Sequence, residues 1–486
     1  MRRILLMFVF VAVLCSPALA SRAEVSGDNA YEHVEFLTSI APRFAGTEAE
    51  AIAASYIENE FRSYGLETWV EDFTIENSYV IEENWLRVTS PEQFDLTFIP
   101  AVYSPSTDNI IIGQLVRVTE KPENLEQLRE CVILVERNIL VEGKNFLRTL
   151  VDLPPLAVLT YFENWPPYSE IWPDSPGAPL FWISGEDVQR LIELLEQGEV
   201  EVELRLRARI ERSTSHNVLA KLPGKSEEII IVGAHHDSVL TPGAVDDASG
   251  VAVVLEMARV LSMENLPRTI LFTTFGSEEL GLLGSAAFVR EHADNKIVAA
   301  IVFDVIAPGP ENGLRVGLRN SWEVATTEWL DNYVQRIAKN LGFYTQSENA
   351  QDVGGYSDYA SFTRAGIPGT WVYWVNPQHG EILWPTHTLA DNLDAIDKTR
   401  LEQVTLFGVE LVRRLASEDI EALRQAYELH LLLAAFAVVS AGAVVLSIAT
   451  GSFMRYRRGW SWSRAVRVFS LLTAAVVFAA YILLLA

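Results

Sequence analysis

Residues 216–415 alternate between short apolar runs and amphipathic segments, and this alternation constrains the fold more than any other feature. The segment Glu228–Ala234 (EIIIVGA) is a continuous apolar run after its first residue, which is typical of a parallel strand covered by helices on both faces. Further strands are expected at Thr269–Phe275, Lys296–Phe303 and Gly369–Val375. The helices expected between and after the strands are Ser249–Leu261, Leu280–His292, Trp322–Leu341 and Ala395–Leu415. The pattern predicts an α/β fold with a mainly parallel sheet flanked by helices.

The part of the chain before residue 213 contains two segments with different residue patterns. Residues 28–72 are expected to be mainly helical, because apolar side chains recur at helical spacing, with a strand at Leu66–Val70. Residues 75–212 are richer in β-type runs and contain a Pro- and Trp-rich stretch at 154–178. The elements expected there are strands at Ile110–Val118, Cys131–Glu136 and Val200–Ile210 and a helix at Gly185–Gln197.

These residue patterns indicate one α/β domain that is interrupted by an insertion. We assign the α/β domain to residues 28–74 and 213–417, and a β-rich inserted domain to residues 95–212. No histidine cluster or metal-type spacing of acids occurs in the inserted segment, so we expect any reactive site in the α/β domain.

The first 20 residues are typical of a secretory signal peptide. Two arginines precede the apolar stretch Ile4–Leu14, and a small–x–small sequence ends at Ala20. We expect cleavage after Ala20. The alternative is an uncleaved N-terminal anchor, for which the apolar stretch is short.

Two uncharged segments near the C-terminus, Leu429–Ala449 and Val468–Ala486, have 21 and 19 residues. Each is long enough to cross ~30 Å of hydrocarbon as a helix. The connecting loop, residues 450–467, carries five arginines, which places it in the cytoplasm by the positive-inside rule. We therefore predict two transmembrane helices and a multi-pass cell-membrane protein whose main body is extracytoplasmic. The alternative is a pair of buried core helices.

The charge of the chain restricts its partners. It carries 38 Lys+Arg and 64 Asp+Glu, a net charge of -26, and residues 21–428 alone carry -33. Such acidity argues against nucleic-acid binding, which needs basic surfaces that neutralise phosphate. After signal removal only Cys131 remains, so no intrachain disulfide supports the exported body.

Histidine and acidic residues follow the ends of the predicted strands, where the carboxyl ends of parallel strands share one edge. His235 ends the first strand, and Asp237 lies on the same side if the chain stays extended, where its carboxylate can orient the imidazole. The other candidates are Asp246, Glu278, Glu279, Asp304 and His387. Each one alone is compatible with a cap or a turn, and their joint placement is what indicates a site.

The composition of this set suits zinc. Two imidazoles and three carboxylates can hold two Zn²⁺ ions with one carboxylate shared between them. An adjacent fourth carboxylate is then left over as a general base.

The motifs around these residues resemble those of the co-catalytic di-zinc exopeptidases, the family of bacterial leucyl aminopeptidases and glutamate carboxypeptidase II. The similar segments that carry candidate ligands are GAHHDS, PGAVDDASG, FGSEELGLLGS, the strand-end Asp304 and the THT around residue 387. The similar framework segments are RFAGTEAEAIAASYI, HNVLAKLPG and SDYASFTRAGIPG. The resemblance covers about residues 28–72 and 213–417, and the motifs follow one another along the chain in the same order as in the family.

The resemblance implies a role for each residue. His235 and Asp304 would hold one zinc ion, and Glu279 and His387 would hold the other. Asp246 would bridge the two ions. The implied general base is Glu278, and Asp237 would orient His235.

Two departures from the family pattern stand beside these matches. His236 occupies a position that is often aromatic or aliphatic, and VIAPGP follows Asp304 in place of the commoner Met-Ile-Gly. The inserted segment resembles a protease-associated domain, which implies a lid or substrate-access element.

The implied activity is that of a membrane-tethered extracellular zinc aminopeptidase that hydrolyses N-terminal residues from peptides. A glutamate-carboxypeptidase-type exopeptidase has the same metal set, but no arginine can be assigned to a substrate carboxylate from sequence. A single-zinc glutaminyl cyclase and a non-catalytic receptor-like ectodomain are further alternatives. Retention of His235 and His387 argues against the cyclase, and retention of all five ligands argues against the receptor.

Overall fold

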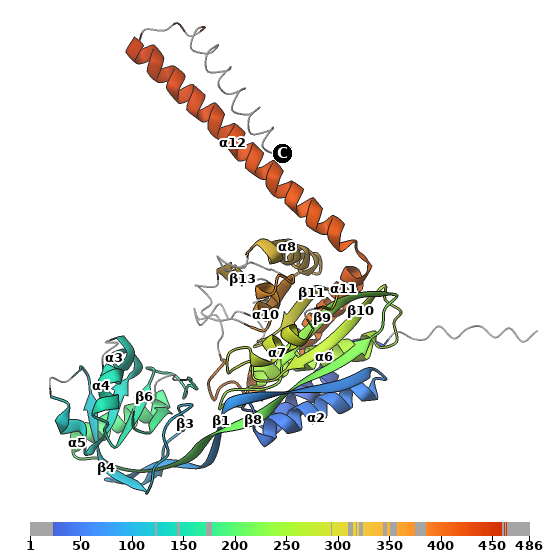
Figure 1. The fold of residues 1–486 in the computed structure, drawn as a ribbon. Helices are drawn as coiled ribbons and strands as arrows, with labels where there is room; N and C mark the ends of the chain where they lie inside the picture. The colour runs from blue at the N-terminus through green and yellow to red at the C-terminus, as the bar shows by residue number, and fades with distance from the viewer. Residues whose placement is uncertain are drawn as a thin grey trace, which may run out of the picture.

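The structure is a computed structural model that describes residues 23–458, 461 and 463. Within this span the gaps are residues 122–123, 143–145, 172–176, 293, 310–313, 317, 320–323, 344–347, 350–356 and 375–384. The described chain folds around a 13-stranded sheet flanked by helices, which confirms the predicted mixed α/β fold (Figure 1). The predicted signal peptide (residues 1–20) and second transmembrane helix (residues 468–486) lie outside the described residues.

Four parallel strands form the centre of the α/β part, in the order β15-β11-β9-β10. They are β9 (Ser226–His235), β10 (Arg268–Phe275), β11 (Ile297–Phe303) and β15 (Gly369–Trp374). Alternate side chains of β9 enter different cores, Ile230 and Val232 on one face and Ile231 on the other. The apolar run in the sequence therefore reflects burial on both faces, as expected for a parallel sheet.

Helices cover both faces of this sheet. The larger core packs β9 against α1 (Gly27–Ser39), α2 (Glu48–Ser63), α6 (Ser249–Leu261), α8 (Val324–Asn340) and α11 (Lys398–Ser417). The opposite core contains α7 (Leu283–Glu291) and α10 (Tyr359–Arg364). Short elements complete this part: β12 (Leu314–Val316), β13 (Leu318–Arg319), β14 (Glu348–Asn349), the π-helical turn η2 (Ala244–Ala248) and the 3-10 turn η3 (Leu393–Ala395).

Two predicted helices start later than their sequence pattern indicates. The helix predicted from Leu280 begins at Leu283, because Ser277, Gly281 and Leu282 have left-handed φ angles that no α-helix contains. The helix predicted from Ala395 begins at Lys398, where the Asp397 side chain accepts the N–H of Arg400 as an N-cap.

A long two-stranded ribbon connects the α/β part to the insert, a name we use for residues 91–200. Strands β1 (Glu67–Ser90) and β8 (Glu201–Leu222) pair antiparallel over nearly their whole length. The predicted domain boundaries, near residues 74 and 213, lie inside these strands. The predicted strand Val200–Ile210 is therefore the first half of a longer one, which continues beside β10.

The insert continues the sheet away from the α/β part (Figure 1). Its parallel strands β4 (Ile111–Val118), β5 (Cys131–Glu136), β6 (Ala157–Tyr161) and β7 (Leu180–Ile183) follow β8 in that order. The remaining elements are β2 (Phe94–Asp95), β3 (Phe98–Pro100), the 3-10 turn η1 (Glu126–Leu128), α3 (Arg137–Glu142), α4 (Phe146–Asp152) and α5 (Gly185–Gln197).

The chain ends in one long helix, α12 (Ile420–Arg458), which projects away from the rest of the molecule (Figure 1). Its segment Ile420–Gly442 is the one helix among the described residues that is long and apolar enough to cross a membrane. The predicted loop at residues 450–467 is wrong at its start, because the helix continues through Arg458.

His33 on α1 is held in a buried pocket between two tyrosines. Its Nδ1 lies 2.7 Å from the Tyr56 hydroxyl and its Nε2 lies 3.3 Å from the Tyr64 hydroxyl. Burial, with a smaller contribution from Arg259, lowers the pKa of His33 from its usual 6.5 to about 4. The folded protein therefore keeps this imidazole neutral at a pH where the unfolded chain binds a proton.

We expect this group to make the fold less stable as the pH falls. Because the native state binds fewer protons, the stabilisation is present above pH 6.5 and is lost as the pH falls towards 4. Between pH 7 and 5 the loss amounts to about 2 kcal/mol. In urea unfolding, the free energy of unfolding of His33→Gln should therefore fall by about 2 kcal/mol less between pH 7 and 5 than that of the wild-type protein. An unchanged difference between the two pH values would contradict the assignment.

Candidate metal centre

The seven candidate side chains come together at the carboxyl ends of the central strands. His235 is the last residue of β9, the turn carrying Glu278 and Glu279 follows β10, and Asp304 follows β11. Asp246 lies in η2, directly before α6, and His387 lies in a loop that precedes α11. Residues far apart in the sequence thus meet at one sheet edge because parallel strands end there together.

One group of ligand atoms surrounds His235. Its Nε2 lies 3.0 Å from Oδ1 of Asp246 and 3.5 Å from Oδ1 of Asp304. The imidazole and the Asp304 carboxylate are almost fully buried. One oxygen of each aspartate therefore lies beside the same imidazole nitrogen.

A second group surrounds His387. Its Nε2 lies 3.1 Å from Oε2 of Glu279 and 3.5 Å from Oδ2 of Asp246. Asp246 therefore directs one carboxylate oxygen to each imidazole, which is the arrangement that a shared carboxylate requires.

Asp247 also lies close to His235 and Asp304, and proximity alone would group it with them. Its carboxylate is occupied by the backbone, since Oδ2 accepts the N–H of His235 and Oδ1 accepts those of Gly250 and Val305. We therefore treat Asp247 as a structural residue that ties η2 to the ends of two strands. The Asp246–Asp247 peptide bond is cis.

Asp237 fixes the turn that carries the two glutamates. Its Oδ1 accepts the N–H of Glu278 at 3.0 Å, and its Oδ2 accepts that of Glu279 at 3.2 Å. The same carboxylate lies 3.5 Å from Nδ1 of His235, so it contacts the imidazole edge that faces away from Asp246. One buried side chain thus holds the acidic pair by hydrogen bonds and lies beside the histidine.

The Glu278 side chain has a different environment. The residue is 9% exposed, and its carboxylate accepts no hydrogen bond from the residues that the structure describes. Burial raises the pKa of Glu278 well above its usual value, the nearby His235 opposes the change, and the carboxylates of Glu279, Asp358 and Asp304 reinforce it.

The cluster has more negative groups than its own cations can balance. Burial alone would lower the pKa of His387, but Glu279, Asp246 and Asp391 raise it to about 9. Oδ1 of Asp304 and Oε1 of Glu279 are buried without a hydrogen-bond partner among the described residues. Buried carboxylate oxygens without a hydrogen-bond partner are costly unless a cation balances them. Beside two imidazoles they form a suitable site for a divalent cation that prefers nitrogen and oxygen ligands.

Sequence reasoning missed two supporting residues. The Asp391 carboxylate accepts the N–H groups of Val245 and Asp246, so it holds the backbone that presents the shared carboxylate. Arg43 is fully buried and donates to backbone carbonyls of the same loop, at Pro242 and Gly243. The sequence signals were the place of Asp391 four residues after His387 and that of Arg43 at the start of the framework segment RFAGTEAEAIAASYI.

The departure at His236 has a structural explanation. Its Nε2 lies 3.2 Å from Oε1 of Glu50, and its Nδ1 lies 3.1 Å from the Thr274 hydroxyl. Glu50 also accepts the Ser215 hydroxyl, so the pair lies in a buried network behind the sheet edge. His236 contacts none of the five candidate ligands through these bonds.

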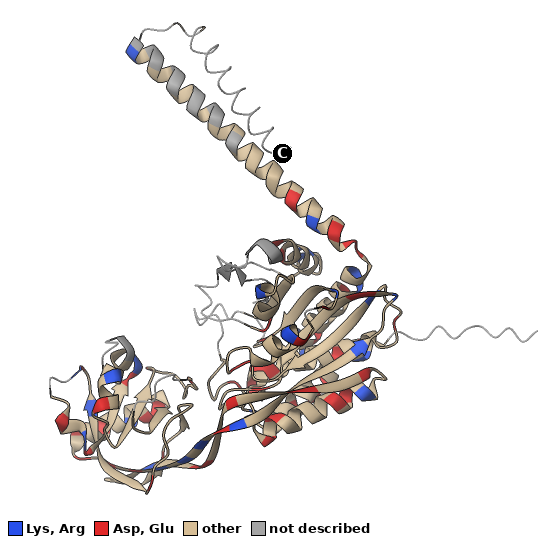
Figure 2. Cartoon of the chain, in the orientation of Figure 1, with Lys and Arg blue, Asp and Glu red and all other residues tan. Residues whose placement is uncertain are grey.

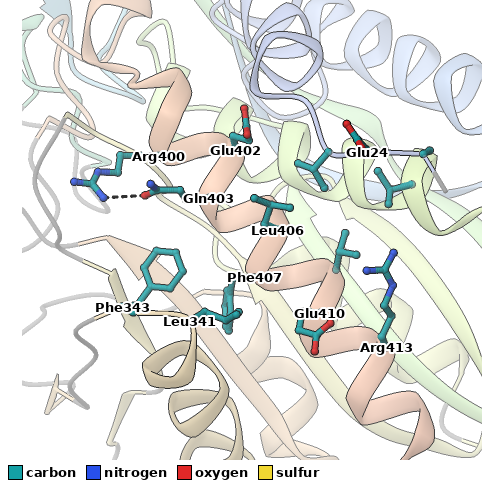
Figure 3. Close-up of a pocket in the computed structure, with 15 residues that line it drawn as sticks. Glu24, Leu341, Phe343, Arg400, Glu402, Gln403, Leu406, Phe407, Glu410 and Arg413 are labelled. Atoms are coloured by element: carbon teal, nitrogen blue, oxygen red, sulfur yellow. Dashed lines mark hydrogen bonds between the residues drawn. The ribbon is translucent and has the colours of Figure 1, made fainter. Parts of the chain in front are cut away.

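A groove elsewhere on the molecule is unrelated to this cluster. It has a volume of about 740 Å³ and lies between residues 23–25, the segment Leu341–Phe343 and α11 (Figure 3). Arg400 and Gln403 form a hydrogen bond at its rim. None of its 15 lining residues belongs to the acid–imidazole cluster.

Comparison with known proteins shows that the segment carrying the cluster is similar to a peptidase family. Residues 217–412, which include all seven candidates, match the model of Peptidase family M28. Aminopeptidase YwaD of Bacillus subtilis (strain 168) is 29% identical over 397 residues, which are 77% of this chain and 82% of that protein. Leucine aminopeptidase 1 of Ajellomyces capsulatus (strain H88) is 29% identical over 224 residues, 42% of this chain and 57% of the relative.

Two solved structures share the fold. BSAP, a zinc aminopeptidase from Bacillus subtilis, aligns with a TM-score of 0.63 and 27% identity over 80% of this chain and 95% of that one. An aminopeptidase from Aneurinibacillus sp. strain AM-1 aligns with a TM-score of 0.55 and 26% identity, and the alignment covers 80% of this chain and 93% of that one. The alignments extend beyond the family-matched segment.

Proposed function

We propose that the chain is an aminopeptidase that acts through two zinc ions. Residues 217–412 match the model of peptidase family M28, and the chain is a zinc-dependent hydrolase of peptide bonds. The observation that carries the proposal is the pair of imidazole–carboxylate groups that share Asp246. The names of the similar proteins support the choice of aminopeptidase.

We assign one zinc ion to His235, Asp246 and Asp304, and the other to Asp246, Glu279 and His387. Bound zinc would supply Lewis acidity and lower the pKa of coordinated water. Asp237 and Asp391 would keep these ligands in place, since they hold His235, the glutamate turn and the backbone of Asp246.

Glu278 is the proposed general base. Its side chain lies in the same cluster without a structural hydrogen bond among the described residues, so its oxygens are free to accept a proton from the attacking water. The same side chain can then pass that proton to the leaving amine.

The net charge of the body favours a substrate with a free amine. Residues 21–428 carry a net charge of -33. An acidic surface attracts a cationic N-terminus better than a C-terminal carboxylate.

We further propose that α12 tethers the protein to a membrane. The helix has no Asp, Glu, Lys or Arg from Leu429 to Met454, and its charged residues lie towards its two ends (Figure 2). This uncharged stretch is long enough to span the hydrocarbon layer. The N-terminal signal-type sequence and the arginines after Met454 support an extracytoplasmic body.

The two neighbouring glutamates provide a matched test of the roles. Glu278→Gln should retain about two zinc ions per chain and lose ~10²–10⁴ in kcat, because only the proton acceptor is removed. Glu279→Gln removes a proposed ligand and should lower the zinc content itself. Metal analysis and peptidase kinetics on both variants check this, and full activity in Glu278→Gln would show that its role is assigned wrongly.

Substrate panels test the aminopeptidase assignment. We expect cleavage of aminoacyl fluorogenic amides, loss of cleavage after N-acetylation, and loss after zinc chelation with recovery when zinc returns. Glu278→Gln prepared in parallel excludes a contaminating peptidase. Faster release of C-terminal residues from N-acetylated peptides would instead establish a carboxypeptidase.

Cys131 is a natural reporter of orientation, because it is a partly exposed thiol in the insert. In intact cells that express the full chain, a membrane-impermeant maleimide should label Cys131 as strongly as in lysed cells. The protein should also stay in the pellet after alkaline extraction. Cys131→Ser is the control, and labelling only after lysis would place the body inside the cell.

A further inference from the structure

The insert forms a short antiparallel contact with the loop that carries His387. The Ser169 N–H donates to the His387 carbonyl at 2.6 Å, and the Leu389 N–H donates to the Pro167 carbonyl at 3.3 Å. Tyr168 and Thr388 face each other as a β-bridge. Residues 167–169 thus pair with residues 387–389, across a sequence separation of more than 200 residues.

His387 needs support of this kind. Its φ angle is 60°, in the left-handed region that a residue with a Cβ atom rarely adopts. The hydrogen bond from Ser169 engages the carbonyl of this same residue. Its imidazole is 29% exposed, so it is less enclosed by protein than that of His235, which is 1% exposed.

The Tyr168 side chain links His387 to the core of the insert. Its ring centroid lies 5.8 Å from that of His387, at an interplanar angle of 37°. The Tyr168 ring also packs against two aromatic rings of the insert, with centroid distances of 5.5 Å to Trp182 and 5.9 Å to Phe162. Trp182 is only 1% exposed and belongs to the insert's own apolar core, so Tyr168 cannot shift without disturbing it.

Further contacts fix this segment of the insert. The Ser169 hydroxyl accepts the N–H of Leu240, and the Glu170 carbonyl accepts that of Val102. The Glu170 side chain also forms a salt bridge with Arg137 at 2.6 Å. A mixed apolar cluster lies between the insert and the α/β part, with Phe44, Leu240, Leu280 and Leu389 packed near Ile99, Val102 and Ile171.

We propose that Tyr168 and the paired backbone of residues 167–169 are a positioning element for His387, so that the seating of the insert and the retention of zinc at the Glu279–His387 site are linked. The proposal rests on the metal assignment made above. Linkage is reciprocal, so loosening this contact weakens zinc binding at that site, and removing zinc loosens the contact.

Zinc release from the holoenzyme tests the first half of the linkage. In Tyr168→Ala, transfer to a chromogenic chelator should be between about twofold and tenfold faster for one of the two ions, the range that an aromatic contact supports. The other ion should leave at the wild-type rate. Tyr168→Phe keeps the ring and should restore wild-type release.

Tyr161→Ala is the matched control, because Tyr161 is a buried tyrosine of the insert in a different apolar core. It should destabilise the insert while leaving zinc release unchanged. Equal release from wild type and Tyr168→Ala, or equally accelerated release from Tyr161→Ala, would overturn the proposal. A wild-type protein that holds fewer than two zinc ions would instead refute the two-zinc function itself.

Hydrogen exchange tests the reciprocal half. Chelation of the wild-type protein should accelerate exchange of the Ser169 and Leu389 amides, which donate across the contact. The amides of β5, inside the insert, serve as the internal reference. Equal protection of the contact amides with and without zinc would show that the insert and the metal site are independent.

Discussion

The structure depends on a concentration of buried negative charge at one edge of the central sheet. The carboxylates of Asp246, Glu279 and Asp304 converge on His235 and His387, and two of their oxygens lack hydrogen-bond partners among the described residues. Burying so many acids is costly unless cations balance them. The surrounding fold is the framework that holds these side chains in place.

The framework works mainly through hydrogen bonds to the backbone. Asp237 holds the glutamate turn, Asp247 ties η2 to the ends of two strands, and Asp391 holds the peptide groups before and at Asp246. Arg43 adds a buried positive charge that binds carbonyls of the same loop. These residues need not touch a metal to matter, because a ligand is only as well placed as the backbone that carries it.

The insert takes part in the same arrangement. It extends from the α/β part on the β1–β8 ribbon and returns to contact the loop of His387 through Tyr168. Its position is thereby connected to the second group of ligand atoms. This connection brings a β-rich segment, whose described residues supply none of the candidate ligands, into contact with one of them.

The sequence by itself determined the α/β fold, because runs such as Glu228–Ala234 are apolar on both faces, and it determined which residues stand at strand ends. It also supplied the uncharged stretch of α12. Only the tertiary structure decided that Asp246 presents one oxygen to each imidazole while backbone N–H groups occupy Asp247, and that Tyr168 contacts His387. Adjacent acids look alike in a sequence, and contacts across 200 residues have no local pattern; both depend on how distant segments pack.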